Sequence, residues 1–223
     1  YGLKTQADYT AREISFSGLK TNFTVFHQGK KLGNISSSCL GNHNVCNTLA
    51  AVAVGMELNM EFPAIADALK NFTGVQRRFE ILKQSESVII VDDYGHHPAE
   101  IQATLATAKN VWPDRRLVVI FQPHRFSRTQ HLLESFYSSF NDADQLILLD
   151  IYGAGEKPID GINSRKMAQG VREFGHKHVD HIENLDSVVP HLKNSLQPGD
   201  VILTLGAGNI GELAHKLTAQ FHD

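Results

Sequence analysis

The sequence predicts an α/β fold in which a doubly wound, mostly parallel sheet forms the larger, carboxyl-terminal part. From Phe79 onward, four short apolar runs alternate with stretches of helical periodicity. That pattern is typical of strands buried between two layers of helices. Residues 1–40 instead alternate apolar and polar side chains, as antiparallel strands with one solvated face do. We therefore expect a Rossmann-like domain preceded by a smaller, mixed α/β region.

The first region is expected to hold three strands and two helices. Gly, Lys and Asn residues separate the strands as turns, and Pro63 suits the first turn of the second helix. The first helix is rich in small apolar residues, which predicts close packing on most of its sides. We place the domain boundary at residue 75, which gives domains of residues 1–75 and 76–223. The predicted strands are 9–18, 21–30 and 31–38, and the predicted helices are 44–58 and 63–72.

The second region is expected to hold a sheet of four apolar strands with helices between them. Its length suits a single domain of ordinary size. Because strands and helices alternate along the chain, the strands are expected to be parallel. The predicted strands are 87–91, 116–121, 145–150 and 199–205, and the predicted helices are 98–110, 130–140, 164–174, 187–194 and 209–220.

The composition excludes several classes of function. Of the 223 residues, 42% are apolar and 20% are charged, and the net charge of −3 gives no reason to expect nonspecific binding to nucleic acid or membrane lipid. No apolar run approaches the roughly 20 residues that span a bilayer, and no secretory signal opens the sequence. Cys39 and Cys46 are expected to be buried thiols, because they lack the number for a disulfide scaffold and the spacing for zinc. We therefore expect a cytoplasmic protein.

Polar side chains crowd two places where predicted strands end. The stretch DDYGHHP, residues 92–98, follows one apolar run, and QPHRFSRT, residues 122–129, follows the next. In open parallel sheets, ligands bind at the carboxyl ends of the strands. Guanidinium groups bind carboxylate or phosphate bidentately, so Arg125 and Arg128 indicate an anion site. Surface ion pairs are the alternative interpretation of these two arginines.

The stretch GAGNIG, residues 206–211, has the glycine spacing of dinucleotide-binding proteins and follows the last predicted strand. No further strand with an acidic ribose ligand follows it, so a dinucleotide is not predicted. The glycines are instead expected to let the last helix approach the sheet and to leave backbone amides at its amino end.

Several motifs, taken in order, resemble the Mur ligase family, and the resemblance runs over nearly the whole chain. DDYGHHP and QPHRFSRT are the specific ones. The resemblance implies that residues 1–75 are the last portion of a central, mixed α/β ATPase domain, and that residues 76–223 are the Rossmann-like ligase domain. The other motifs are GNHNVCN (41–47), GVQRRF (74–79), YGAGE (152–156) and GAGNIG.

The resemblance also implies an activity. The family member that the motifs match best uses ATP and Mg²⁺ to join L-alanine to UDP-N-acetylmuramate through an acyl phosphate, in peptidoglycan precursor synthesis. The sequence contains no phosphate loop of the form G-x-x-x-x-G-K-[ST], and the family's Mg²⁺ ligands have no counterpart in it. It also begins without Met, so we expect a fragment that is inactive alone and holds no metal itself.

The resemblance assigns five residues to nucleotide binding. His43, Asn44 and Asn47 would contact the adenine side of ATP, and an Asn amide offers both the donor and the acceptor that a purine edge needs. Arg78 would reach the phosphates as a catalytic residue, and Tyr94 would pack near the adenine. Helix capping is the alternative role for Asn44.

The resemblance assigns two catalytic residues besides Arg78: Asp93, on the nucleotide side of the cleft, and His96, on the substrate side. His96 would face the acyl substrate, where it could donate to a carboxylate or an oxyanion. Arg125 and Arg128 would clamp the carboxylates of the alanine and the acyl substrate, with His124 beside them. The cluster would then form one wall of a cleft between two domains.

Three neighbours are expected to serve the structure instead. Asp92 and His97 would hold the turn after the strand, because short polar side chains commonly stabilise turns. Arg77 is expected to be a solvated neighbour of Arg78. Two other functions stay open on the sequence: a related ligase that adds a peptide in place of alanine, and a Rossmann-like binding module without catalysis.

Overall fold

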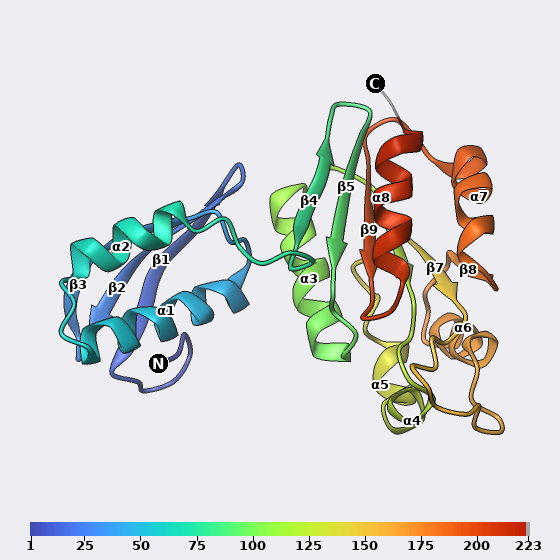
Figure 1. Cartoon of the computed structure of the whole chain (residues 1–223), viewed down its shortest axis with the longest axis horizontal. Helices are drawn as coiled ribbons and strands as arrows, with labels where there is room; N and C mark the ends of the chain where they lie inside the picture. The colour runs from blue at the N-terminus through green and yellow to red at the C-terminus, as the bar shows by residue number, and fades with distance from the viewer. Residues whose placement is uncertain (222–223) are drawn as a thin grey trace. The chain divides into compact units, whose positions relative to one another are not determined.

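The computed structural model describes residues 1–221 of the chain. It consists of two compact units, one of Tyr1–Val75 and one that begins at Gln76 (Figure 1). Each unit has its own sheet.

Unit 1 is a three-stranded antiparallel sheet packed against two helices. The alternation read from the sequence places Phe23, Val25 and Ile35 on the face that packs against the helices, where they are buried. The strands are β1 (Tyr9–Ser17), β2 (Lys20–His27) and β3 (Lys30–Ser37), and the helices are α1 (Asn42–Glu57) and α2 (Phe62–Asn71).

Two expectations about unit 1 are wrong. Helix α1 is buried on one face within this unit, since Leu49 is buried but Val54 is 60% exposed. A helix that lies on one face of a sheet buries one stripe of side chains, whatever the composition of its other positions. Cys39 and Cys46 are free cysteines that are half-buried, not buried.

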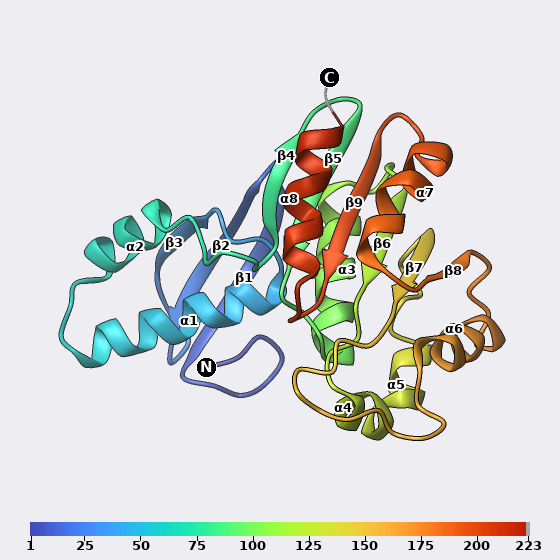
Figure 2. The same cartoon turned by 45° about the vertical axis from the view of Figure 1, so that its right-hand side comes forward.

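Unit 2 is built on a six-stranded sheet of order β4-β5-β9-β6-β7-β8, in which β4 runs antiparallel to β5 and the other neighbours are parallel (Figure 2). This confirms the mostly parallel sheet. The strands are β4 (Glu80–Gln84), β5 (Val88–Asp93), β6 (Leu117–Phe121), β7 (Gln145–Leu149), β8 (Val179–Ile182) and β9 (Asp200–Leu205).

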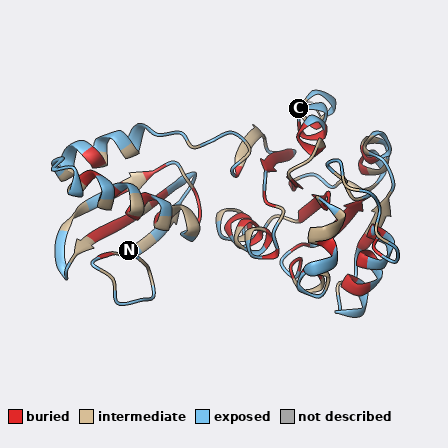
Figure 3. Ribbon diagram, turned by 60° about the horizontal axis from the view of Figure 1, so that its bottom comes forward, coloured by how far each residue is buried: buried red, intermediate tan, exposed pale blue. Residues whose placement is uncertain are grey.

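Helices cover both faces of this sheet, as the doubly wound prediction requires. Helices α7 and α8 pack on alternate residues of the central strands. The residues between these point to the opposite face, where Phe121 contacts Phe136 of α5. Figure 3 shows buried positions along the central strands. The helices are α3 (Pro98–Val111), α4 (Phe126–His131), α5 (Leu133–Tyr137), α6 (Ser164–Glu173), α7 (Val188–Ser195) after the short 3₁₀ turn η1 (Leu185–Ser187), and α8 (Ile210–Gln220).

Three details of unit 2 differ from the prediction. Strands β4 and β8 were not predicted, because EILKQ and VDHI carry polar residues that a two-sided apolar run lacks. The predicted helix 130–140 is wrong, since the segment forms the two short helices α4 and α5 with a break at Leu132.

None of the helices in the described part of the chain has both the length and the apolar composition needed to cross a membrane.

Candidate active-site edge of unit 2

The carboxyl ends of four parallel strands meet at one edge of the unit 2 sheet. In the ladder, Asp93 of β5 pairs with Leu205 of β9, and Leu205 pairs with Phe121 of β6, which pairs with Leu148 of β7. The segments 92–98, 122–129, 150–156 and 206–211 therefore leave the sheet along the same edge. The rings of His96 and His124 lie 5.9 Å apart, so the two polar stretches found in the sequence do converge.

Asp93 is buried at the end of β5, with 4% of its surface exposed. Its carboxylate accepts hydrogen bonds from the backbone N–H groups of Phe79 at 2.8 Å and Gly95 at 2.7 Å. Burial raises the pKa of Asp93 to about 6, although these two backbone donors and the Arg78 charge oppose that shift. Oδ1 thus holds the turn that follows β5, a role that the sequence had suggested for Asp92 and His97, and Oδ2 ties the end of β5 to Phe79, just before β4.

Arg77 and Asp92 form an ion pair beneath this turn, and the expectation that Arg77 is solvated is wrong. Arg77 Nε lies 2.8 Å from Asp92 Oδ2, and its Nη2 donates to the carbonyl of Gly206 at 2.7 Å. Asp92 also accepts from the hydroxyl of Thr204 at 2.6 Å. The pair therefore ties the end of β5 to β9 and to the glycine loop that follows β9, which fits the structural role expected of Asp92.

Helix α3 begins with a reciprocal cap. The side chain of His97 accepts from the N–H of Ala99, and the Glu100 side chain accepts from the backbone N–H groups of His96 and His97. These hydrogen bonds satisfy donors that a helix start leaves unpaired. His97 is therefore structural here. Glu100 was missed, although its place three residues after His97 is the spacing of a capping box.

Tyr94, in the turn after β5, lies close to Arg78, which precedes β4. Tyr94 is 37% exposed, and the guanidinium groups of Arg77 and Arg78 lie 5.1 and 5.7 Å from the centre of its ring. Arg78 is half-exposed and lies 3.8 Å from Glu100. A flat, exposed ring next to cations can accept a further aromatic group by stacking, which is compatible with the nucleotide role expected of both residues.

The hydrogen bonds of the two histidines determine where each ring carries its proton. His96 Nδ1 lies 3.1 Å from the carbonyl oxygen of Tyr94, which can only accept, so this nitrogen carries the proton. His124 Nδ1 lies 3.1 Å from Arg128 Nη1, which can only donate, so in His124 the proton is on Nε2. Burial, together with nearby positive charge, lowers the pKa of both rings. At neutral pH, Nε2 is therefore an acceptor in His96 and a donor in His124.

Tyr152 joins the loop after β7 to the loop after β6. Its ring is stacked on that of His124 with centroids 5.7 Å apart. Its backbone accepts from the N–H of Arg125 at 2.8 Å and donates to Pro123 at 2.8 Å. Arg128 donates to the carbonyl of His124 at 3.2 Å. The arginines and His124 are thereby brought to one place, with Tyr152 as a neighbour that sequence analysis had not assigned.

The glycines of GAGNIG make room for neighbours at this edge. A Cβ on Gly206 would lie 2.8 Å from the carbonyl of Gln122, and one on Gly208 would lie 2.6 Å from Gln122 Oε1 and 2.9 Å from Tyr152. A Cβ on Gly211 would lie 2.9 Å from the guanidinium of Arg77. The first two glycines thus permit close approach to the end of β6, whereas the third accommodates Arg77.

Three candidate residues lie at the start of α1 in unit 1. Asn44 donates to the carbonyl of Leu40 at 2.8 Å, and Asn47 donates to Asn44 Oδ1 at 3.1 Å. The N-cap position is Gly41, so helix capping by Asn44 is wrong. His43 is half-buried beside them and Asn47 is exposed. The two amides share one face of the helix start, as their spacing predicts.

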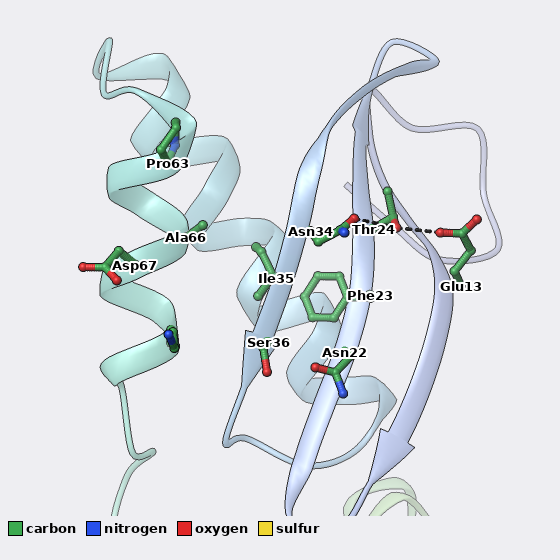
Figure 4. Close-up of a pocket in the computed structure, with 11 residues that line it drawn as sticks. Glu13, Asn22, Phe23, Thr24, Asn34, Ile35, Ser36, Pro63, Ala66 and Asp67 are labelled. Atoms are coloured by element: carbon green, nitrogen blue, oxygen red, sulfur yellow. Dashed lines mark hydrogen bonds between the residues drawn. The ribbon is translucent and has the colours of Figure 1, made fainter.

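Unit 1 also contains a cavity of about 560 Å³ between the sheet and α2 (Figure 4). Thr24 donates to Glu13 at 2.7 Å and lies 3.0 Å from Asn34 on its wall. None of the candidate site residues lines this cavity.

Residues 77–208 match the family model described as Mur ligase, glutamate ligase domain. A UDP-N-acetylmuramate–L-alanine ligase from Syntrophotalea carbinolica is 50% identical over 217 residues, which cover 97% of this chain and 47% of the relative. The chain thus spans about half the length of the curated relatives that it matches.

Solved structures show the same relationship. The crystal structure of the UDP-N-acetylmuramate–alanine ligase from Thermotoga maritima has a TM-score of 0.81 at 29% identity and covers 98% of this chain and 46% of that one. A MurF ligase from the same organism, in complex with ADP, has a TM-score of 0.69 at 15% identity, over 94% of this chain and 45% of that one. Since the family model covers more than half of the described chain, the chain belongs to the Mur ligase family.

Proposed function

We propose that this chain is part of an ATP-dependent ligase that joins L-alanine to UDP-N-acetylmuramate through an acyl phosphate, in the synthesis of peptidoglycan precursors. The observation that carries the proposal is the convergence of Arg125, Arg128, His96 and His124 at one edge of the sheet. This is a local site for anions in a chain whose net charge is −3. Curated relatives that are 50% identical to this chain over 217 residues bear the name of this ligase.

The arginines suit the two carboxylate groups of the reaction. A guanidinium group binds a carboxylate through two parallel N–H donors and keeps its charge at any working pH. Arg128 donates to His124 through Nη1 alone. Its Nε and Nη2 can therefore donate to a substrate. We assign Arg125 and Arg128 to the carboxylates of alanine and of the acyl substrate, as their motif suggests.

The two histidines suit the proton movements of amide formation. When the amine attacks the acyl phosphate, a proton leaves the nitrogen and negative charge develops on the former carbonyl oxygen. The acceptor Nε2 of His96 can receive that proton, and the donor Nε2 of His124 can stabilise the oxyanion. The donor role that the sequence suggested for His96 thus passes to His124, because Nδ1–H of His96 is engaged by the Tyr94 carbonyl.

Five residues are assigned to nucleotide binding by the groups that they offer. Asn44, Asn47 and His43 offer donors and acceptors for adenine, Tyr94 offers a ring face, and Arg78 offers charge for phosphate. ATP supplies the phosphoryl group that activates the carboxylate. No phosphate loop of the Walker type occurs in the sequence, and we place Mg²⁺ binding outside this chain. Asp93 is retained as a residue that fixes the turn carrying Tyr94 and His96.

The test is an assay of phosphate release by a full-length ligase that contains this segment, with ATP, Mg²⁺, UDP-N-acetylmuramate and one amine substrate at a time. We expect turnover with L-alanine, and none with the 223-residue chain alone. Preference for an L-alanine-containing tripeptide over free alanine would favour the peptide ligase. No turnover with any amine, despite nucleotide binding, would favour a binding module.

A further inference from the structure

Helix α4 is a six-residue helix that carries Arg128 and directly follows Arg125. Helices of this length are marginal by themselves, because few hydrogen bonds compensate for the cost of ordering the first turn. Its first N–H groups have no partner inside the helix, and its N-cap residue, Arg125, makes no side-chain capping bond. Something outside the helix must therefore hold the turn that presents the two arginines.

Glu156, from the loop after β7, supplies that cap. Its Oε2 accepts from the backbone N–H of Ser127 at 2.9 Å, and its Oε1 accepts from the Ser127 hydroxyl at 2.7 Å. Arg125 Nη1 lies 3.9 Å from the same Oε1. The hydrogen bonds from Ser127 hold the pKa of Glu156 below its usual range, so the cap is ionised at neutral pH.

Both loops are bent in ways that make this contact possible. Arg125 has a φ of 73°, and Ala154 and Gly155 have φ values of 49° and 87°. Positive φ is uncommon for residues other than glycine, and it persists where the surroundings compensate for it. The N–H of Glu156 closes its own turn on Gly153 at 2.9 Å. The turn of residues 153–156 thus brings the carboxylate back onto the amino end of α4.

We infer that Glu156 is a positioning residue: by capping α4 from the neighbouring loop, it fixes Arg125 and Arg128 in the geometry in which they bind carboxylates, that of the amino-acid substrate among them. The inference rests on the proposed function for the identity of that substrate. Glu156 acts through Ser127 and the two arginines, and does not itself touch the substrate.

The hydrogen bonds, more than the charge, should carry this role. Glutamine at position 156 can still accept from the Ser127 N–H through its oxygen, and its amide can donate to the Ser127 hydroxyl oxygen, which is able to accept. Alanine makes neither bond. A positioning role therefore predicts that Glu156→Gln is milder than Glu156→Ala, and that Ser127→Ala, which removes one of the two bonds, lies between wild type and Glu156→Ala. A residue that bound the alanine ammonium directly would make Glu156→Gln as severe as Glu156→Ala.

The first experiment is steady-state kinetics on a full-length ligase that contains this segment, with Glu134→Ala on α5 as the exposed control. Glu156→Ala should raise the KM for L-alanine roughly 10- to 100-fold, with the KM for ATP and the melting temperature close to wild type. Glu156→Gln should recover most of that loss. Equal effects on alanine and ATP, a loss that tracks the melting temperature, or a Glu156→Gln variant as poor as Glu156→Ala would overturn the inference.

The second experiment does not depend on which reaction the protein catalyses. Amide hydrogen exchange is measured on the 223-residue chain for peptides that contain residues 126–129. Protection should fall in Glu156→Ala, be largely kept in Glu156→Gln, and be unchanged in Glu134→Ala. Unchanged protection in Glu156→Ala would overturn the inference even if the wild-type ligase uses alanine. If the wild type does not use alanine, the proposed function fails, and lost protection in Glu156→Ala would still support the cap itself.

Discussion

The side chain of Asp93 makes contacts that its sequence motif does not reveal. The motif marked it as functional, yet both of its oxygens are engaged by backbone donors and the side chain is buried. The sequence could indicate that carboxylates lie where this strand ends, but not which of the two neighbouring aspartates accepts from backbone N–H groups, because the pleat and the turn decide that together. The same limit applies to Arg77 and Arg78, adjacent residues of which one is tied to Asp92 and the other is half-exposed.

The raised pKa of Asp93 makes stability depend on pH. Because its pKa is about 6 in the folded chain and about 3.9 in an unfolded one, the folded state binds more protons between these values. The free energy of unfolding contributed by Asp93 is therefore greatest at low pH and is lost as the pH rises through about 6. Urea unfolding of wild type and Asp93→Asn should show a stability difference that changes by about 2 kcal/mol between about pH 4 and pH 7.

The sign of that change is the decisive result. Relative to Asp93→Asn, the wild type should lose stability as the pH rises, whereas an Asp186→Asn control on an exposed position should show no comparable trend. If the free energy of unfolding of the wild type instead increases relative to that of Asp93→Asn as the pH rises, the folded state lowers the pKa of this carboxyl.

Arg128 should not tolerate lysine in a full-length ligase. Lysine keeps a positive charge but lacks the planar pair of donors that matches a carboxylate. Arg128→Lys should lower kcat/KM for L-alanine by an amount that corresponds to roughly 2–3 kcal/mol of lost transition-state stabilisation. The KM for ATP and the melting temperature should be nearly unchanged. Arg165→Lys, in an exposed ion pair with Glu183, is the matched control. Alanine kinetics like those of wild type would remove Arg128 from the site.

At the scale of elements, the strands with uninterrupted apolar runs were predictable and the edge strands were not. β5, β6, β7 and β9 are buried at every position, so their sequences contain little besides apolar residues. β4 and β8 lie at the edges of the sheet, where partly exposed positions accept charge. Helices α4 and α5 were merged in the prediction, because their apolar positions continue across Leu132 while the backbone there does not.

The contact between loops explains why Glu156 had no predicted role. It stands 29 residues from Ser127 in sequence, and nothing local marks an acid in one loop as the cap of a helix in another. Glu100, by contrast, caps the helix on which it lies, so its spacing alone could have identified it.

Helix α8 gives a test of packing at the element scale. In most helices, replacing glycine by alanine stabilises by about 1 kcal/mol. At Gly211 the new Cβ would lie 2.9 Å from the Arg77 guanidinium. This guanidinium is held in place, because it donates hydrogen bonds to Asp92 and to the carbonyl of Gly206. Gly211→Ala should therefore destabilise by about 1–3 kcal/mol, as overpacking does.

A double-mutant cycle separates this cause from others. In an Arg77→Ala background the collision is absent, so the additional cost of Gly211→Ala should vanish or change sign. A single Gly211→Ala variant that melts at a higher temperature than wild type would show that Arg77 moves aside at little cost.

At the scale of the whole chain, the two units differ in how completely they bury their sheets. The strands of unit 1 mix buried positions with partly and fully exposed ones, and Val54 of α1 and the C-cap residue Leu58 are 60% and 69% exposed. The sheet of unit 2 lies between helices on both faces. The composition could distinguish these two regions. It could not predict which residues each side chain contacts.

Hydrogen exchange should reflect this difference. Amides of β5, β6 and β9 should be the slowest to exchange in the 223-residue chain, and amides of β1–β3 should exchange faster, because fewer buried contacts oppose their opening. Mass spectrometry of peptides from both units in one sample makes the comparison internal. Equal protection in the two sheets would mean that unit 1 is as stable by itself as unit 2.

The position of β9 affects how the protein can be made. This strand, residues 200–205, is inserted between β5 and β6 and pairs with both. A ribosome that moves along the message completes β5 and β6, which end at residues 93 and 121, well before it reaches residue 200, where the strand that joins them begins. Until then, each of these apolar strands has an unpaired backbone edge, the kind of surface that chaperones cover and other nascent chains can join. The sheet, and with it the edge that carries the arginines and histidines, closes only when translation of this segment is almost complete.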